Sequence, residues 1–288
     1  MQTPPSKPVS SSTRSDVAET SASDSGSSGE LVSIVVPVYN EAENIVPLLE
    51  TVSSEAPSSH ETLLVYDFDE DTTLPPARAF SSQYPALRLV KNAHGPGVLN
   101  ALKTGLDEAR GDVVAVVMAD LSDDVSQISE MAALIRGGAG LVAASRYMRE
   151  GKQIGGPPVK RTLSRLAGLS LRWLTLIGTH DATNNFKAYS RELVDEIEVE
   201  SGSGFELGLE MATKAQLGGY LIDEIPTTWR DRTAGESRFQ VLKWMPGYLR
   251  WYLLCIAGTW TGQRRRAIRD RAQRARSSHS GSERVSKG

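Results

Sequence analysis

Short apolar runs alternate with longer amphipathic segments from residue 31 onwards. LVSIVVPVYN at 31–40 is a β-branched apolar run, which predicts a buried strand that ends in a polar loop. The next segment, 41–52, has apolar residues at helical spacing and predicts an amphipathic helix. The same criteria predict further strands at 61–68, 87–92 and 112–119 and further helices at 76–84 and 97–110.

This alternation predicts an α/β fold of Rossmann-like type, with a mostly parallel sheet flanked by helices. Parallel strands need right-handed helical crossovers, which cover both faces of the sheet. Ligands of such sheets bind beyond the carboxyl ends of the strands. Three predicted strands end in polar loops, at 37–41, 67–71 and 120–124, so we expect one crevice to receive all three.

The two ends of the chain differ from the middle. Residues 1–30 contain ten serines and almost no large apolar residue, which predicts a disordered tail without the apolar centre of a secretory signal. Residues 263–288 contain eight arginines and one lysine against two acids, which predicts a basic disordered tail. Because the whole chain has a net charge of −3, the middle is acidic, which argues against a nucleic-acid-binding face.

An aromatic segment precedes the basic tail. WMPGYLRWYLLCIAGTW at 244–260 contains three tryptophans, two tyrosines and one interior charge, Arg250. Its unbroken apolar part, 251–260, is too short to cross about 30 Å of hydrocarbon as a helix. We interpret 241–262 as an interfacial helix that, with the arginines behind it, binds an anionic membrane surface. The alternative is a helix packed on the core and followed by a solvated tail.

The chain has one cysteine, Cys255, which cannot form an internal disulfide. No CxxC motif or Cys/His cluster indicates a zinc site. We therefore expect a reducing compartment. Together with the interfacial helix, this predicts a cytoplasmic protein that is peripheral at the cytoplasmic face of the membrane. The sequence gives no prediction of oligomeric state.

Several motifs follow one another between residues 31 and 240. They are VSIVVPVYNEAENI from Val32, LLVYDFDEDTT from Leu63, the segment from Asn92 to the DLSDD at 120–124, and TWRDRTAGESRF from Thr228. ASRYMREG and DATNNFKAYSREL lie in between. Their order and spacing resemble the family 2 glycosyltransferases of GT-A fold, most closely the dolichol or polyprenol phosphate sugar synthases. The resemblance implies a GT-A domain at 31–240 and a hexosyltransferase that uses a nucleotide-sugar.

The pyrophosphate of a nucleotide-sugar is strongly negative, so an acidic protein needs a divalent cation between it and the carboxylates. By the resemblance, Asp120 stands at the last Asp of the family's DxD motif and is the expected metal ligand. Oxygen ligands suit Mg²⁺ or Mn²⁺. The first acid of the motif is replaced by Met118, so we expect Ser122, Asp123 or Asp124 to supply further oxygens, unless this acidic run is only a solvated loop.

The resemblance also implies a donor pocket. Asp67 is expected to bind the donor's base and Asp71 to lie near the ribose or base, although Phe68 replaces the family's glycine between them. The alternative is an exposed acidic turn. The same pocket is expected to include Pro37, Tyr39 and Glu41, with Pro37 equally interpretable as a strand terminator.

Two further elements of the resemblance concern the pyrophosphate. Gly95 and Gly97 match the glycine pair that lets backbone approach the nucleotide, but Pro96 stands where a lysine is frequent. Arg232 and Arg238, in DRTAGESRF, match the late block that clamps the pyrophosphate in a loop. Arg232 is therefore expected to act with Asp120 in catalysis, although a surface ion pair is its alternative role.

For the acceptor, the resemblance implies a polyprenol or dolichol phosphate held by Arg146 and Arg161, both of which have lipid headgroup contact as an alternative role. A lipid phosphate is largely dianionic at pH 7 and needs no general base. The four histidines form no recognisable catalytic arrangement. We expect one in-line displacement with inversion at the anomeric carbon. GDP-mannose is the donor that the family suggests, and UDP-glucose remains open.

Two other functions remain open on the sequence. The acceptor is a saccharide or lipid-linked glycan hydroxyl in the first, where Glu206 or Glu210 in GFELGLEM is the candidate base. In the second, the protein binds a nucleotide-sugar without turnover, because the first DxD acid is missing.

Overall fold

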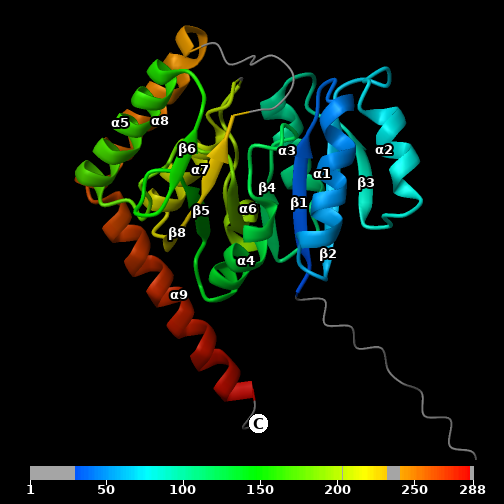
Figure 1. Cartoon of the computed structure of the whole chain (residues 1–288). Helices are drawn as coiled ribbons and strands as arrows, with labels where there is room; N and C mark the ends of the chain where they lie inside the picture. The colour runs from blue at the N-terminus through cyan, green and yellow to red at the C-terminus, as the bar shows by residue number, and fades with distance from the viewer. Residues whose placement is uncertain (1–29, 203, 232–240, 286–288) are drawn as a thin grey trace, which may run out of the picture.

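The computed structural model describes residues 30–202, 204–231 and 241–285, with side chains described up to residue 274 except at 241–243 (Figure 1). The predicted disordered tail before residue 30 lies outside these residues, as do Arg232 and Arg238. Within them the chain forms a seven-stranded sheet of order β3-β2-β1-β4-β7-β5-β8 and a separate two-stranded sheet, β6-β9.

The larger sheet is mostly parallel, which confirms the predicted fold class. Only β7 runs antiparallel to its neighbours β4 and β5 in the sheet as described. The strands are β1 (Val32–Pro37), β2 (His60–Tyr66), β3 (Leu87–Lys91), β4 (Val113–Val116), β5 (Leu141–Ser145), β6 (Lys152–Ile154), β7 (Lys187–Ser190), β8 (Ile222–Pro226) and β9 (Thr228–Arg230).

Helices cover both faces of the sheet because the central strands alternate their apolar side chains between two buried clusters. In β1, Ile34 and Val36 join one cluster and Val35 joins the other. Helices α1, α2 and α4 pack on the first face, and α3, α6 and α7 pack on the second. The helices are α1 (Ala42–Glu55), α2 (Leu74–Ser81), α3 (Val98–Glu108), η1 (Val125–Gln127), α4 (Ile128–Arg136), α5 (Pro158–Thr175), α6 (Arg191–Glu196), α7 (Leu207–Leu217), α8 (Val241–Trp260) and α9 (Gln263–Val285).

The strands and helices predicted before residue 120 all occur, as β1 to β4 and α1 to α3. The strand registers pair Pro37 with Val65 and Val35 with Val116, so β1, β2 and β4 end at the same edge of the sheet. β7 runs the other way, and its first residue therefore lies at this edge too. The loops that follow β1, β2 and β4 and the loop that precedes β7 consequently meet.

The C-terminal part of the chain forms two helices. α8 packs on α5 and α7 and buries Trp251 and Cys255, while its other side stays exposed. Residues 263–285 form α9, which corrects the prediction of a disordered tail. α9 is anchored because the Arg271 guanidinium lies 3.4 Å from the centroid of the Tyr220 ring and pairs with two glutamates of α6. In the part of the chain that the structure describes, no helix is long and apolar enough to cross a membrane.

Helix α5 lies close to the loop that precedes β7, and Gly168 permits this approach. A Cβ built on Gly168 would lie only 2.2 Å from the carbonyl oxygen of His180, well inside van der Waals contact. One turn earlier in the helix, Ser164 Oγ lies 2.6 Å from Thr183 Oγ1 of the same loop. The absence of a side chain at position 168 therefore decides whether α5 can reach this loop.

We expect Gly168→Ala to lower the free energy of unfolding by about 1–3 kcal/mol, because the added methyl group meets backbone that cannot move aside. Urea unfolding measures the change. Gly202→Ala is the matched control, since a Cβ there has no atom within 4 Å. Equal stability of the Gly168 variant and the wild type would contradict this packing.

Candidate active site at the carboxyl ends of the strands

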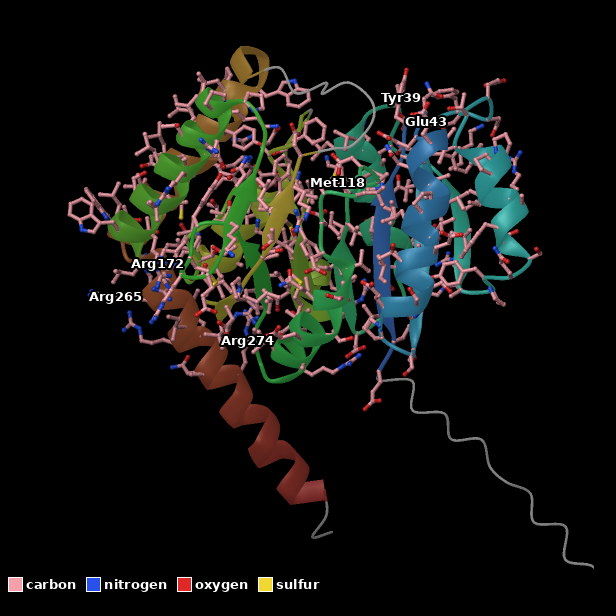
Figure 2. The ribbon with its side chains drawn as sticks, viewed as in Figure 1. Tyr39, Glu43, Met118, Arg172, Arg265 and Arg274 are labelled. Carbon is pink, nitrogen blue, oxygen red and sulfur yellow. The ribbon has the colours of Figure 1, made fainter. Side chains whose placement is uncertain are left out.

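A cavity of about 870 Å³ opens at the edge where β1, β2 and β4 end. The loops after these strands form one side of it, and α5, α8, the β6-β9 sheet and the loop before β7 form the other. Figure 2 places Tyr39 at this end of the molecule. Most of the predicted site residues line the cavity: Pro37, Tyr39, Glu41, Asp67, Gly97, Asp120, Ser122, Asp123, Arg146 and Arg161.

Asp67 is fixed in the cavity wall by two hydrogen bonds. Its Oδ1 accepts from Asn92 Nδ2 at 2.8 Å and its Oδ2 accepts from the backbone N–H of Gly97 at 2.9 Å. Gly97 has a φ of 122°, which side chains rarely allow, so a glycine is needed where the loop turns into α3. Gly95 is not among the lining residues, but its carbonyl accepts from Asn92 and shapes the same turn.

Asp71 is buried and is not among the lining residues, contrary to its predicted place near the ribose or base. Its Oδ1 accepts from the backbone N–H of Asn40 at 3.0 Å and of Thr73 at 2.8 Å. These bonds join the loop after β1 to the loop after β2. Asp71 therefore positions the loop that carries Tyr39 instead of facing the cavity.

The acidic loop after β4 turns three predicted ligands toward the cavity. Leu121 has a φ of 60°, a left-handed conformation that leucine rarely adopts, and Asp120, Ser122 and Asp123 on either side of it line the cavity. Asp120 Oδ1 accepts from the N–H of Ser122 at 3.2 Å, and Asp123 Oδ2 accepts from the N–H of Met118 at 2.9 Å. Burial and the nearby charge of Asp120 raise the pKa of Asp123 to about 7. A cation beside this pair would relieve the repulsion.

These oxygens fit a hard divalent cation. Mg²⁺ is commonly bound through one or two carboxylates together with substrate phosphates, so Asp120 and Asp123 suffice when a pyrophosphate completes the coordination. Among the described residues, no three or more His, Cys, Asp and Glu side chains form a group that could hold a metal by themselves. Asp124 is exposed, accepts from Ser126 Oγ and does not line the cavity, so its position gives its predicted ligand role no support.

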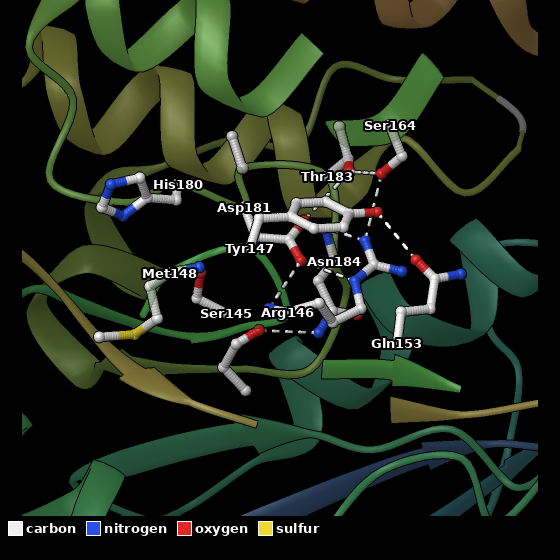
Figure 3. A network of polar contacts seen from close by, with 12 residues as sticks. Ser145, Arg146, Tyr147, Met148, Gln153, Ser164, His180, Asp181, Thr183 and Asn184 are labelled. Atoms are coloured by element: carbon white, nitrogen blue, oxygen red, sulfur yellow. Dashed lines mark hydrogen bonds and ion pairs between the residues drawn. The ribbon is translucent and has the colours of Figure 1, made fainter. Parts of the chain in front are cut away.

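Arg146 and Asp181 form a buried bidentate ion pair in the floor of the cavity (Figure 3). Arg146 Nε and Nη2 donate to Asp181 at 2.6 and 2.9 Å, and Nη2 also donates to Ser164 Oγ at 3.2 Å. Burial raises the pKa of Asp181, but the charge and hydrogen bonds of Arg146 outweigh it and hold the pKa below its ordinary value. These side-chain hydrogen bonds of Arg146 use Nε and Nη2, and its third nitrogen, Nη1, has no hydrogen bond among the described residues.

Helix α5 contributes wall residues that the sequence analysis missed. Lys160 and Ser164 line the cavity beside the predicted Arg161, whose side chain is exposed at the cavity mouth. Ser164 links the Arg146 guanidinium to Thr183 and so ties the helix to the floor. Residues four apart on a helix share a face, and this spacing is the signal that connects Lys160 with Ser164.

The β6-β9 sheet forms a further part of the wall. Gln153 of β6 pairs with Trp229 of β9, and both side chains line the cavity. Gln153 Oε1 accepts from the hydroxyl of Tyr147 at 3.1 Å, which connects this sheet to the residue after Arg146. Arg232, the predicted clamp of the pyrophosphate, follows closely after β9 but lies outside the described residues, as does Arg238, so both roles remain predictions.

An aromatic group closes the cavity beside α5. The rings of Phe205 and Trp244 lie 4.7 Å apart, and the hydroxyl of Tyr248 donates to the carbonyl of Phe205 at 2.9 Å. All three line the cavity together with Met245. The side of the cavity formed by α5 and α8 is thus more apolar than the side formed by the strand loops.

The two glutamates of the alternative mechanism do not line the cavity. Glu206 is buried at the start of α7, and burial raises its pKa. Glu210 is fully buried and accepts from the N–H groups of Glu200 at 2.6 Å and Ser201 at 3.0 Å. Glu210 therefore acts as a structural acceptor, and neither carboxylate is placed to take a proton from a hydroxyl in the cavity.

Comparison with known sequences supports the resemblance found in the motifs. The sequence model of glycosyl transferase family 2 matches residues 33–198, more than half of the chain. The chain is 28% identical over 212 residues to dolichol-phosphate mannosyltransferase of Pyrococcus furiosus, an alignment that covers 73% of this chain and 59% of that protein. It is 28% identical over 227 residues to polyprenol monophosphomannose synthase of Mycolicibacterium smegmatis, covering 73% and 85%.

Solved structures share the fold. Glucosyl-3-phosphoglycerate synthase from Mycobacterium tuberculosis, in complex with Mn²⁺, UDP-glucose and phosphoglyceric acid, has a TM-score of 0.60 at 21% identity and covers 79% of this chain and 80% of its own. Its complex with Mn²⁺, UDP and glucosyl-3-phosphoglycerate has a TM-score of 0.57 at 17% identity, with 80% of each chain covered. At these identities the likeness establishes the shared fold alone.

We expect Asp181→Asn to destabilise the fold by about 3–5 kcal/mol, because it leaves the buried charge of Arg146 uncompensated. Thermal and urea unfolding measure the effect. Asp124→Asn removes an exposed carboxylate outside the cavity and should change stability by no more than about 0.5 kcal/mol. A small effect at Asp181 would mean that Arg146 finds other partners and that the pair does not hold the floor.

Proposed function

Because the chain belongs to glycosyltransferase family 2, we propose that it transfers a hexose from a nucleotide-sugar to a polyprenol or dolichol phosphate at a membrane surface. The names of two relatives, a dolichol-phosphate mannosyltransferase and a polyprenol monophosphomannose synthase, support mannose as the sugar and a lipid phosphate as the acceptor. The chain spans 59% of the length of the first of these relatives, so substrate and partner are inferred chiefly from the site.

One observation carries this proposal: the two sides of the same cavity differ in chemistry. The side formed by the strand loops presents Asp67, Asp120 and Asp123, which suit a nucleotide and a cation. The side formed by α5 and α8 presents basic and aromatic residues, which suit a phosphate attached to a lipid. A saccharide acceptor would instead require polar hydrogen-bonding groups and a base on that second side.

The residues of this site then supply positioning and charge. A divalent cation bound by Asp120 and Asp123 would neutralise the pyrophosphate and stabilise the leaving nucleoside diphosphate. Asp67 orients the nucleotide at the end of β2. Arg146, Lys160 and Ser164 would hold the acceptor phosphate on the opposite wall, with its oxygen in line with the anomeric carbon. Transfer by one such displacement inverts the anomeric configuration.

No residue has to act as a general base in this reaction, because a dianionic phosphate is already a nucleophile. The burial of Glu206 and Glu210 outside the cavity agrees with this requirement and speaks against transfer to a hydroxyl. The third possibility is that the protein binds a nucleotide-sugar without turnover. The transfer assay described below distinguishes it from the proposed reaction.

The membrane contact is proposed for one face of α5 and α8, which lie side by side (Figure 1). Trp173 is 80% exposed and Leu176, directly after α5, is 76% exposed, although large apolar side chains are rarely left in water in such a group. The face reaches the active site, because Leu163 and Met245 belong both to it and to the cavity wall. Its other exposed residues are Val159, Leu166, Leu249, Leu253, Leu254 and Trp260.

Positive charge adjoins this apolar face. α9 begins at Gln263, after two residues that separate it from α8, and continues with three arginines at 264–266. Figure 2 shows Arg265 pointing away from the sheet. Such a cluster next to an apolar helix favours anionic lipid headgroups. The resulting interfacial role of α8, with a cytoplasmic and peripheral location, remains a prediction, and the free thiol of Cys255 agrees with a reducing compartment.

We expect Asp120→Ala to reduce sugar transfer at least about 100-fold at saturating Mn²⁺ or Mg²⁺, because the leaving diphosphate loses its bridge to the protein. The assay offers GDP-mannose or UDP-glucose with a short polyprenyl phosphate and follows labelled sugar into the organic phase. Asp124→Ala, in the same loop but outside the cavity, should retain activity.

Wild-type activity toward a saccharide but not toward polyprenyl phosphate would replace the proposed acceptor. Nucleotide-sugar binding without transfer to either acceptor would support the binding-protein alternative. Full activity of Asp120→Ala would remove the cation site from the mechanism.

We expect the double substitution Leu166→Glu with Leu253→Glu to weaken binding to phosphatidylcholine vesicles containing phosphatidylserine by about tenfold or more, because it puts two charges on the apolar face. Co-sedimentation with the vesicles measures the change. Leu221→Glu alters a leucine that is similarly exposed but lies outside α5 and α8, and binding should stay unchanged. Equal binding of the double variant and the wild type would place the membrane contact elsewhere.

A further inference from the structure

Lys187 is a fully buried lysine at the edge of the sheet where the active site lies. It is the first residue of β7 and pairs with Val116 of β4 and Ala143 of β5, so it lies in the interior of the sheet. Its side chain is 0% exposed. Burying an ammonium group is unfavourable unless hydrogen bonds and opposite charges compensate.

The contacts of Lys187 are with backbone rather than with a carboxylate. Its Nζ donates to the carbonyl of Ala182 at 3.2 Å and, at shorter range, to the carbonyl of Asn184. Among the described residues it forms no ion pair with a carboxylate, although the charges of Asp181 and Asp123 act on it. Burial lowers the pKa of Lys187 to about 7, and the charge of Asp181 opposes this shift.

The two carbonyls belong to the loop that forms the floor of the cavity on the acceptor side. Thr183, Asn184 and Asn185 of this loop line the cavity, and Asp181 at its start holds Arg146. Two carbonyls of this short loop, those of Ala182 and Asn184, point toward the ammonium group of Lys187. These hydrogen bonds restrict the backbone orientation of the loop and so the directions in which its side chains can point.

Helix α7 restricts the same loop. Asn185 Oδ1 accepts from the backbone N–H of Gly208 at 2.9 Å. A Cβ on Gly208 would lie 2.6 Å from the carbonyl oxygen of Asn184, 2.7 Å from Asn185 Oδ1 and 3.1 Å from Lys187 Nζ. Helix α7 and Lys187 therefore hold the loop between them without free space.

We propose that Lys187 is a positioning residue for the acceptor: it fixes the 182–185 loop, and through it the place of Arg146 and of the acceptor phosphate. This inference rests on the proposed function for the identity of the acceptor. A lysine suits the task because one ammonium group can donate to several carbonyls at once. An apolar residue of the same length fills the space but leaves both carbonyls without their donor.

The experiment compares Lys187→Met with the wild type in the full chain. The KM for a short polyprenyl phosphate should rise at least about tenfold, since a loss of positioning is a loss of acceptor binding. The Kd for GDP in the presence of Mn²⁺, measured by calorimetry, should rise several-fold less than the KM, because Lys187 acts on the cation side only through its charge on Asp123 but holds the 182–185 loop by direct hydrogen bonds. Thermal stability should fall moderately, because two buried carbonyls lose their donor, and the comparison uses a temperature at which the variant stays folded.

Gly208→Ala tests the same loop from the other side and serves if Lys187→Met does not fold. Its added methyl group should displace Asn184 and raise the same KM. Lys214→Met is the control for losing a lysine outside the cavity: Lys214 donates to the carbonyl of Glu198 and pairs with Glu200 and Glu210, so its loss should lower stability but leave the KM unchanged.

An unchanged acceptor KM in folded Lys187→Met or Gly208→Ala overturns the inference. A parallel loss of GDP binding and acceptor binding also overturns it, because it indicates a merely structural role. If the wild type transfers no sugar to polyprenyl phosphate, the proposed function fails instead, and this result is obtained before any variant is measured.

Discussion

The ion pair between Arg146 and Asp181 is the contact on which the site depends. Arg146 directly follows β5, Asp181 lies before β7, and Ser164 on α5 joins them through Nη2 of the arginine. β5 and β7 also pair directly, and α5 touches the loop before β7 at Gly168 and Ser164. With both charges buried, a lost partner would leave the other uncompensated, so the pair strongly restrains the relative position of the three elements. The cavity wall formed by α5 and this loop is built on that ion pair.

β7 runs antiparallel to β4 and β5, and this direction brings the loop before it into the cavity. An antiparallel strand between β4 and β5 begins at the edge where its neighbours end, so the loop before it enters the cavity floor. That loop carries Asp181, the partner of Arg146, and the charges of Arg146 and Lys187 lower the pKa of Asp123 against the effect of burial. The β4 loop and the floor of the cavity are therefore electrostatically connected.

The sequence was sufficient for the fold up to residue 120 and for the gathering of Asp67, Asp120 and Asp123 at one edge of the sheet. Each of these side chains follows a strongly apolar strand, and parallel strands carry such residues to one edge. Their binding roles stay predictions. Asp71 could not be distinguished from Asp67 in the same acidic loop, because only the backbone path shows which carboxylate turns inward. Lys160 and Ser164 were missed because the end of α5 that carries them reads as an ordinary polar helix until the close approach at Gly168 places it on the floor.

The C-terminal segment shows why composition alone left the role of α8 open. An aromatic helix packed on the core and an aromatic helix at a membrane interface have the same composition, and α8 has one buried and one exposed side, so only the packing on the core is observed. Trp251 and Cys255 are buried against the body, while Leu249 and Leu253 are exposed. The second exposed helix, α5, contains five leucines among its arginines and serines, and it leaves Leu163, Leu166 and Trp173 exposed beside α8. This combined face reaches the cavity mouth at Leu163 and Met245. On the proposed function, a lipid acceptor would therefore enter the cavity from the side of α5 and α8.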